Sequence, residues 1–310
     1  MKRKGLYFTT SLLAAFIVLF SCKTTHEVKD IETKTSQQKN DIEHGKKIVS
    51  IACGPCHLDQ STNTFSGSHL IDAPPVLGQL YASSLTKNAE NEVNKYTDGQ
   101  LKYLLRTGIK KDGKMAPFMQ KPNMSDEDLN AIITFLRSDD PMVQANDVHN
   151  PRTKYSAIGN MVIGSQKPLK YPETTIFSPN KNDKVAYGKY LIDIIGCYDC
   201  HSANIMKTDK LNPEKSKGYM GGGTKMLSAD GSKIVTSNLT FHETGLANYT
   251  VQDFGRAVRQ GINKENKVLR YPMRMFTDLN DDDIEAIYTY LKTVPPINNP
   301  DKNPKSKKKD

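Results

Sequence analysis

The sequence predicts an all-α protein made of two tandem helical domains. A five-residue pattern, Cys-x-x-Cys-His, occurs twice, and the first cysteines of the two copies are 144 residues apart. Each copy is followed by the same succession of helix signals, and the length of 310 residues suits about two domains. Hydrophobic residues make up 37% of the chain and charged residues 25%, which is polar for a globular protein but not a disordered composition.

The first 22 residues are predicted to be a lipoprotein signal peptide. Residues 2–4 are basic, residues 6–20 are apolar, and together they have the pattern of a secretory signal. Leu19-Phe20-Ser21-Cys22 resembles the lipobox of bacterial lipoproteins, in which Cys22 is lipidated and becomes the N-terminus. An uncleaved anchor helix, or a plain signal with an incidental cysteine, stays open as an alternative. We expect an exported protein, lipid-anchored on the periplasmic side of a bacterial membrane.

Two polar segments are predicted at the ends of the mature chain. Residues 23–40 are expected to form a flexible tether, and residues 298–310 a Lys-rich tail. Removal of the signal leaves a net charge of 40 − 34 = +6, and the last ten residues hold five lysines and two aspartates. Because an exported protein rarely meets nucleic acid, no nucleic-acid partner is predicted.

The first predicted domain, residues 41–140, has three helix signals. One helix contains Gly45 and runs into the first cysteine motif. A second begins with a capping-box pattern at Thr97 and ends at Gly108. A third begins at Ser125 with acidic residues in its first turn and carries an apolar stripe with i, i+3, i+4, i+7 spacing.

The second predicted domain, residues 183–297, repeats this order. A helix with Gly188 runs into the second motif, a second helix follows Thr250 and ends at Gly261, and a last helix follows Asn280. Between the domains, residues 141–182 are rich in proline and show little periodicity. They are predicted to form an extended connector that lies over both domains.

Cys-x-x-Cys-His is the attachment pattern of c-type haem. Two thiols add across the two vinyl groups of one porphyrin, and the histidine that follows becomes an axial ligand of the iron. A thioredoxin-like redox pair or half of a zinc site would explain one copy, but zinc needs more soft ligands than either copy supplies. We therefore expect two covalently bound haem c groups, held by Cys53, Cys56, His57, Cys197, Cys200 and His201.

The sixth iron ligand decides between electron carrier and enzyme, because a histidine–methionine haem is saturated and transfers electrons. In the first domain the candidates are Met115, Met119 and Met124. In the second they are Met273 and Met275. Spacings from the preceding glycines and to the last helices agree to within one residue when Met119 is paired with Met273, so these two are predicted as ligands.

Four other histidines are also possible iron ligands by residue type, but none has the spacing of a ligand. His69 is the one alternative ligand, and His44 is expected to face solvent. His149 and His242 are expected to be polar loop residues.

The first domain resembles class I cytochrome c through its cysteine motif, residues 101–108, Pro117-Phe118-Met119 and the run from Met124 to Leu129. The second, through residues 237–240 and 290–296, resembles the haem domains of cytochrome c subunits that serve periplasmic alcohol and sugar-acid dehydrogenases. The resemblance covers residues 41–140 and 183–297. It implies two class I cytochrome c domains, each a small helical bundle around one covalent haem. Those subunits often carry three haem domains, whereas this chain has two motifs.

Two functions from different classes follow. The first is a dihaem electron carrier, or electron-transfer subunit, between a dehydrogenase or other redox donor and a cytochrome, oxidase or other acceptor. The second is a dihaem peroxidase, or another redox enzyme for a small substrate, with one open haem site. Matching methionine loops and the absence of tryptophan favour the carrier, for which no catalytic residue is expected.

Overall fold

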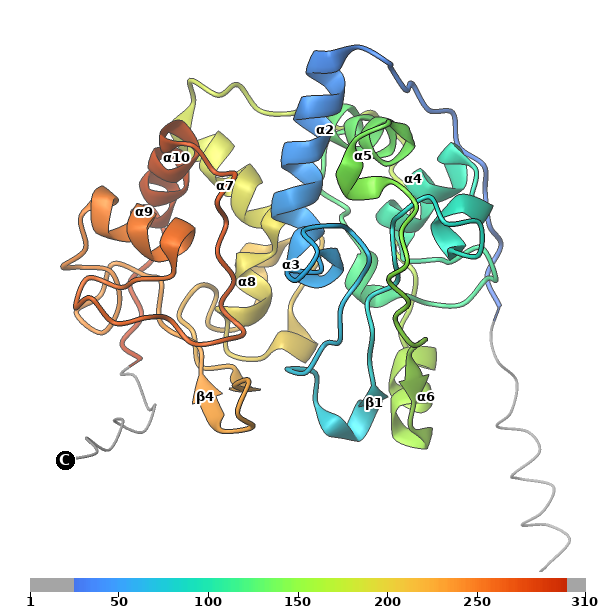
Figure 1. Cartoon of the computed structure of the whole chain (residues 1–310). Coiled ribbons are helices and arrows are strands. Elements are labelled where there is room, and N and C mark those ends of the chain that lie inside the picture. Colours follow the sequence, from blue (N-terminus) through green and yellow to red (C-terminus); the bar gives the residue numbers. More distant parts are fainter. Residues whose placement is uncertain (1–24, 300–310) are drawn as a thin grey trace, which may run out of the picture.

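A computed structural model describes residues 25–299 of the chain. Cys22 and the lysines of the tail lie outside these residues. The described part is mainly helical, and its helices form two groups that lie side by side (Figure 1). We call residues 39–140 the first half and residues 183–297 the second half.

The two halves contain the same order of α-helices. In the first half these are α2 (Lys39–Ala52), α3 (Gly54–His57), α4 (Asp98–Thr107) and α5 (Asp126–Arg137). In the second they are α7 (Lys184–Ile195), α8 (Cys197–Cys200), α9 (Val251–Gln260) and α10 (Asp281–Leu291). Single turns of 3-10 helix lie between them: η1 (Pro75–Leu77), η2 (Glu92–Lys95), η3 (Pro117–Met119), η4 (Pro141–Val143), η5 (Ile205–Lys207) and η6 (Pro213–Lys215).

The first and last helices of each half cross at a glycine. A Cβ atom on Gly45 would lie 2.0 Å from the carbonyl oxygen of Ala131, and a Cβ on Gly188 would lie 2.0 Å from that of Ala286. Only glycine lets the two backbones approach so closely. The pairs α2–α5 and α7–α10 therefore have the same geometry, as the repeated sequence signals indicate.

The predicted helix ends are confirmed. Thr97 and Thr250 each form a capping box with the residue three positions later, and the side chain of Ser125 accepts a hydrogen bond from the backbone of Asp128. Gly108 and Gly261 end their helices in the left-handed conformation, with φ of 80° and 68°.

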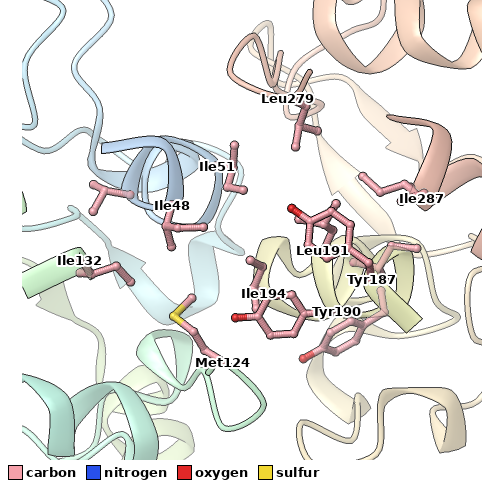
Figure 2. Packing of buried hydrophobic residues seen from close by; sticks show 14 of the residues in the cluster. Ile48, Ile51, Met124, Ile132, Tyr187, Tyr190, Leu191, Ile194, Leu279 and Ile287 are labelled. Carbon is pink, nitrogen blue, oxygen red and sulfur yellow. The ribbon is translucent and has the colours of Figure 1, made fainter. Parts of the chain in front are cut away.

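One buried apolar cluster extends through both halves. Figure 2 shows Ile48 and Met124 of the first half on one side and Leu191 and Ile194 of the second on the other. The two bundles were predicted as separate small cores, so the continuous cluster is a difference. It arises because α2 and α7 also contact each other.

The described residues are mainly helical, in agreement with the predicted all-α fold, and they also contain short strands. Two antiparallel two-stranded sheets are present among the described residues: β1 (Gly78–Gln79) with β2 (Lys154–Tyr155), and β3 (Lys225–Leu227) with β4 (Lys233–Val235). The second sheet is a hairpin whose turn ends at Gly231, with φ of 77°. Asp230-Gly231 is a turn signal that could have predicted it.

The segment predicted as an extended connector has structure of its own. It contains β2 and an eight-residue helix, α6 (Ala157–Gly164), capped by Ser156, whose side chain accepts from the backbone of Gly159. The segment predicted as a flexible tether differs too, because Val28 and Ile31 pack against a second apolar cluster. That cluster is formed by Tyr103, Ile109, Met115 and Ile163, the last of these from α6.

Candidate haem sites

The first cysteine motif begins where α2 ends, and α3 turns its histidine inward. His57 is 6% exposed, and its Nδ1 lies 2.7 Å from the carbonyl oxygen of Ser83. A hydrogen bond donated by Nδ1 to a carbonyl fixes the tautomer and the ring, and it leaves Nε2 as the lone-pair donor. This is the arrangement that an axial iron ligand requires.

The second motif has the same arrangement. Nδ1 of His201 lies 2.8 Å from the carbonyl oxygen of Ser237, so Nε2 is again the free ring nitrogen. Burial lowers the pKa of both His57 and His201, which favours the neutral imidazole that binds a metal. Both donor sets fit a haem iron.

The environment of the four motif cysteines disfavours the thiolate. Burial raises the pKa of Cys53 to about 11 and that of Cys197 and Cys200 to about 12. Burial also raises the pKa of Cys56. A thioredoxin-like pair needs a stabilised thiolate, so this reading is disfavoured. Within residues 25–299 no three His, Cys, Asp or Glu side chains are grouped so that they could hold a metal ion.

The loop with Met119 is held by a buried arginine. Arg106 on α4 is 0% exposed, and its Nη1 donates to the carbonyl oxygen of Pro122 at 2.8 Å and to that of Met124. Its Nη2 lies 3.2 Å from Oδ2 of Asp126. Sequence reasoning did not single out Arg106. It ties the loop that carries Met119 to the helices on either side.

The other methionines of the first half have packing roles. Met115 forms a β-bridge with Ile109 and lies in the second apolar cluster. Its counterpart in the second half is Val268, which forms a β-bridge with Ile262 in the same way. Met124 is 1% exposed in the main cluster, and the residue before the last helix of the second half, Leu279, is likewise 1% exposed. Met119 is half-buried and packs against the main cluster.

Met275 has the position that Gln120 has in the first half. The backbone N–H of Lys121 donates to Leu105, and that of Phe276 donates to Val258, so the residues before them are equivalent. Gln120 packs on Gly108, and a Cβ added to Gly261 would lie 3.3 Å from Cγ of Met275. By this register Met275 corresponds to Gln120 and Met119 to Arg274, so Met273 stays a prediction as the partner of Met119.

The four other histidines considered as ligands contact side chains or backbone of the protein instead. His44 was expected to face solvent, but its Nε2 lies 2.6 Å from Oδ1 of Asp128, which is 3% exposed. His69 is exposed and stacks on Tyr81, with ring centroids 4.5 Å apart. His149 lies 3.6 Å from Glu90, and His242 bonds within its own loop.

The halves exchange equivalent contacts. Lys47 of α2 reaches Oδ2 of Asp283 at 2.5 Å, and Tyr190 of α7 donates to Asp128. Lys47 follows Gly45 by two residues, and Tyr190 follows Gly188 by two. Both carboxylates lie at the same position of the last helix of their half. The interface therefore has an approximate two-fold relation, of the kind seen in isologous dimers.

This interface brings the two cysteine motifs into one electrostatic environment. Nζ of Lys121 donates to the carbonyl oxygen of Ile194 at 2.7 Å. Beyond burial, the charge of Lys121 counteracts the rise in pKa of both Cys53 and Cys197. The charge of Asp72 adds to the rise at Cys56 and Cys200. The charges of Lys121 and Asp72 therefore influence cysteines of both motifs.

Comparison with known proteins identifies the first half. Residues 40–136 match the family "Cytochrome C oxidase, cbb3-type, subunit III". They form a cytochrome c domain. Such a domain implies covalently attached haem c and electron transfer, as the geometry of His57 and its cysteines indicates.

The chain is also homologous to cytochrome subunits of dehydrogenases. It is 25% identical to the fructose dehydrogenase cytochrome subunit of Gluconobacter japonicus over 85% of this chain and 54% of that one. It is 23% identical to the cytochrome c subunit of a quinone alcohol dehydrogenase from Gluconobacter oxydans, over 83% and 55%. It is 25% identical to the gluconate 2-dehydrogenase cytochrome c subunit of Pantoea cypripedii, over 83% and 60%. The chain thus spans little more than half the length of these relatives.

Among residues 25–299, none of the helices has the length and apolar character to cross a membrane.

Proposed function

We propose that this cytochrome c chain is a membrane-tethered dihaem electron carrier. The observation that carries the proposal is the repetition, in both halves, of a motif histidine that donates Nδ1–H to a serine carbonyl. The first half matches a family of haem proteins, and the second half repeats its helices and its glycine crossing. Each half would hold one haem c.

The chain supplies attachment, ligation and burial. Cys53 and Cys56 would form the thioethers of the first haem, with His57 and Met119 as axial ligands. Cys197, Cys200, His201 and Met273 would do the same in the second half. A histidine–methionine haem cycles between ferric and ferrous iron, and the thioether favours the ferrous state. With both axial positions filled by the chain, a peroxidase-like reaction at an open site is not expected.

The interface between the halves supports electron transfer within one chain. Burial raises the pKa of the motif cysteines in both halves. The charge of Lys121 counteracts this rise in pKa at Cys53 and Cys197, and that of Asp72 adds to it at Cys56 and Cys200, so the same two side chains act on cysteines of both halves. Paired contacts of two buried carboxylates, Asp128 and Asp283, hold the halves together. An electron would enter at one haem, cross this fixed junction, and leave from the other.

The relatives suggest the class of donor. They are cytochrome subunits of fructose, alcohol and gluconate dehydrogenases, and we propose a dehydrogenase of a small alcohol, sugar or sugar acid as the donor here. The lipobox-like sequence at Cys22 supports export and a lipid anchor. The acceptor would be another cytochrome or an oxidase.

The experiment that tests this function counts haems and open sites in the purified protein. Pyridine haemochrome assay should give two haem c per chain, and the double variants Cys53→Ala/Cys56→Ala and Cys197→Ala/Cys200→Ala should each retain one. Carbon monoxide should not change the spectrum of the reduced protein, because neither iron has an open site. A single haem in the unaltered chain, or rapid carbon monoxide binding by one haem, would contradict the proposal and favour the peroxidase-like alternative.

A further inference from the structure

An exposed apolar surface surrounds α6. Ile158 is 49% exposed, Met161 68% and the neighbouring Val76 of η1 51%. Ser156 fixes Val76 against the helix, because its Oγ donates to the carbonyl oxygen of Val76 at 2.5 Å. Buried Gly159 and Ile163 attach the opposite side of α6 to the body of the protein. The helix therefore presents apolar side chains to solvent on a firmly attached support.

The segment around α6 is exclusively cationic. Between Asp147 and Glu173 the sequence has four basic residues and no acidic one. Arg152 and Lys154 precede the helix, Lys167 and Lys170 follow it, and all four are exposed. None of the ion pairs found among residues 25–299 includes them. We call these four residues, with Val76, Ile158 and Met161, the α6 face.

This combination of chemistry fits an anionic lipid surface. An apolar helix face enters the boundary between headgroups and acyl chains, while long basic side chains reach the phosphates. Each lysine or arginine near such a surface contributes about 1 kcal/mol, which is roughly a fivefold change in partition. The four basic side chains, with no acidic residue in the segment, would repel a cationic protein partner and attract an acidic bilayer.

The N-terminal end of the described chain leads to the same part of the molecule. The backbone N–H of His26 donates to the carbonyl oxygen of Gly113 at 2.8 Å, and Val28 and Ile31 pack in the cluster that includes Ile163 of α6. Cys22 is three residues before Thr25, and three residues reach at most about 10 Å. A lipid on Cys22 would therefore hold the bilayer close to the part of the first half that carries α6 (Figure 1).

We propose that the α6 face lies on the surface of an anionic bilayer and orients the first half toward the membrane. The proposal goes beyond the lipid anchor, since the anchor alone fixes the distance to the membrane but not the orientation. Only the orientation rests on the proposed function, because binding to lipid depends on the residues of the α6 face alone. It can therefore be tested without the lipid.

The test uses the haem-loaded mature chain, residues 23–310, exported on an unrelated signal so that it carries no lipid. Flotation with vesicles of phosphatidylglycerol and phosphatidylcholine should recover the protein, and pure phosphatidylcholine should not. Lys167→Gln/Lys170→Gln should weaken the partition roughly 25-fold, from about fivefold for each lysine. Met161→Ser should weaken it about tenfold, because an apolar side chain no longer enters the lipid.

Matched controls separate the α6 face from other charged or apolar surface. Lys215→Gln/Lys217→Gln removes two exposed lysines of the second half, and Val268→Ser removes a side chain that is 78% exposed there; neither should change the partition. Deletion of residues 301–310 tests the basic tail. Equal losses with the control variants, or binding that disappears only with the tail, would overturn the proposal. So would a Met161→Ser variant with an altered haem spectrum and unchanged partition, because Met161 would then cover haem rather than lipid.

Discussion

The first and second halves share the contacts that build the fold and differ in the contacts that hold the methionine loop. Gly45 and Gly188 make the same close approach to the last helix, and His57 and His201 donate to equivalent serine carbonyls. Arg106 and Arg259 also have equivalent positions, nine residues after the capping threonines. Arg106 is 0% exposed and bonds to loop carbonyls, whereas Arg259 has a side chain that is 32% exposed and pairs with Asp281 at 2.7 Å.

This difference follows from what covers each loop. In the first half, Lys121 bonds to Ile194 of the second half, and Asp126 accepts from the backbone of Ile176 in the connector. The loop is therefore enclosed, and a buried cation must satisfy its carbonyls. In the second half, Val268 and Met275 are 78% and 54% exposed. The same ion pair thus has a structural role in one half and a surface role in the other.

The largest expected effect comes from this arginine pair. Arg106→Leu leaves two loop carbonyls without a buried donor, while Asp126 keeps Lys102 at 2.8 Å, and we expect a loss of about 2–4 kcal/mol in the free energy of unfolding. Arg259→Leu removes an exposed pair and should cost less than about 1 kcal/mol. Denaturant unfolding of both haem-loaded variants measures the difference. Similar losses would show that the two loops are held alike. Arg106→Lys keeps the charge but not the several N–H donors of the guanidinium group. Its loss of stability should lie between those of Arg106→Leu and Arg259→Leu.

Substitutions at the two helix crossings should instead cause equal losses of stability. Gly45→Ala and Gly188→Ala each place a methyl group against a helix carbonyl, and each should cost about 1–3 kcal/mol. Gly164→Ala, at the end of α6 with no atom within 4 Å of the added Cβ, should change stability by less than about 1 kcal/mol. Thermal or denaturant unfolding checks all three. A harmless substitution at only one crossing would break the equivalence of the halves.

A smaller effect is expected at the interface. Tyr190→Phe removes a hydrogen bond to Asp128, and Lys47→Gln removes the ammonium from Asp283, which keeps the hydroxyl of Tyr187 at 3.0 Å. Each should cost about 0.5–2 kcal/mol. Each should also slow electron equilibration between the haems, measured by flash reduction, because both weaken the same junction. Loss of stability without any change in that rate would separate the contact from electron transfer.

Most of the fold and most of the predicted haem-binding residues follow from local patterns in the sequence. Capping threonines, left-handed glycines and the spacing of Cys53 to His57 depend on neighbours in the chain, and these predictions agree with the structure. The contacts of Lys47 with Asp283 join residues 236 positions apart, and no local pattern predicts them. His44 was misplaced for the same reason, since its partner Asp128 belongs to another helix.

The methionines show how the structure extends a sequence argument. Spacing alone left Met115 and Met275 open. Met115 corresponds to Val268 and Met275 to Gln120, so neither has a methionine as its counterpart in the other half. Tertiary register, which is not visible in the sequence, thus shows the counterparts of Met115 and Met275, while Met119 and Met273 stay predictions.

The most direct measurement is the number of methionine-ligated haems per chain. In the fully oxidised protein, the near-infrared charge-transfer band of sulfur on ferric low-spin haem should correspond to two per chain. Met119→Ala and Met273→Ala should each reduce it to one, while Met115→Ala and Met275→Ala should leave two. One methionine-ligated haem in the unaltered chain, with the other high-spin or bis-histidine, would contradict the symmetric carrier.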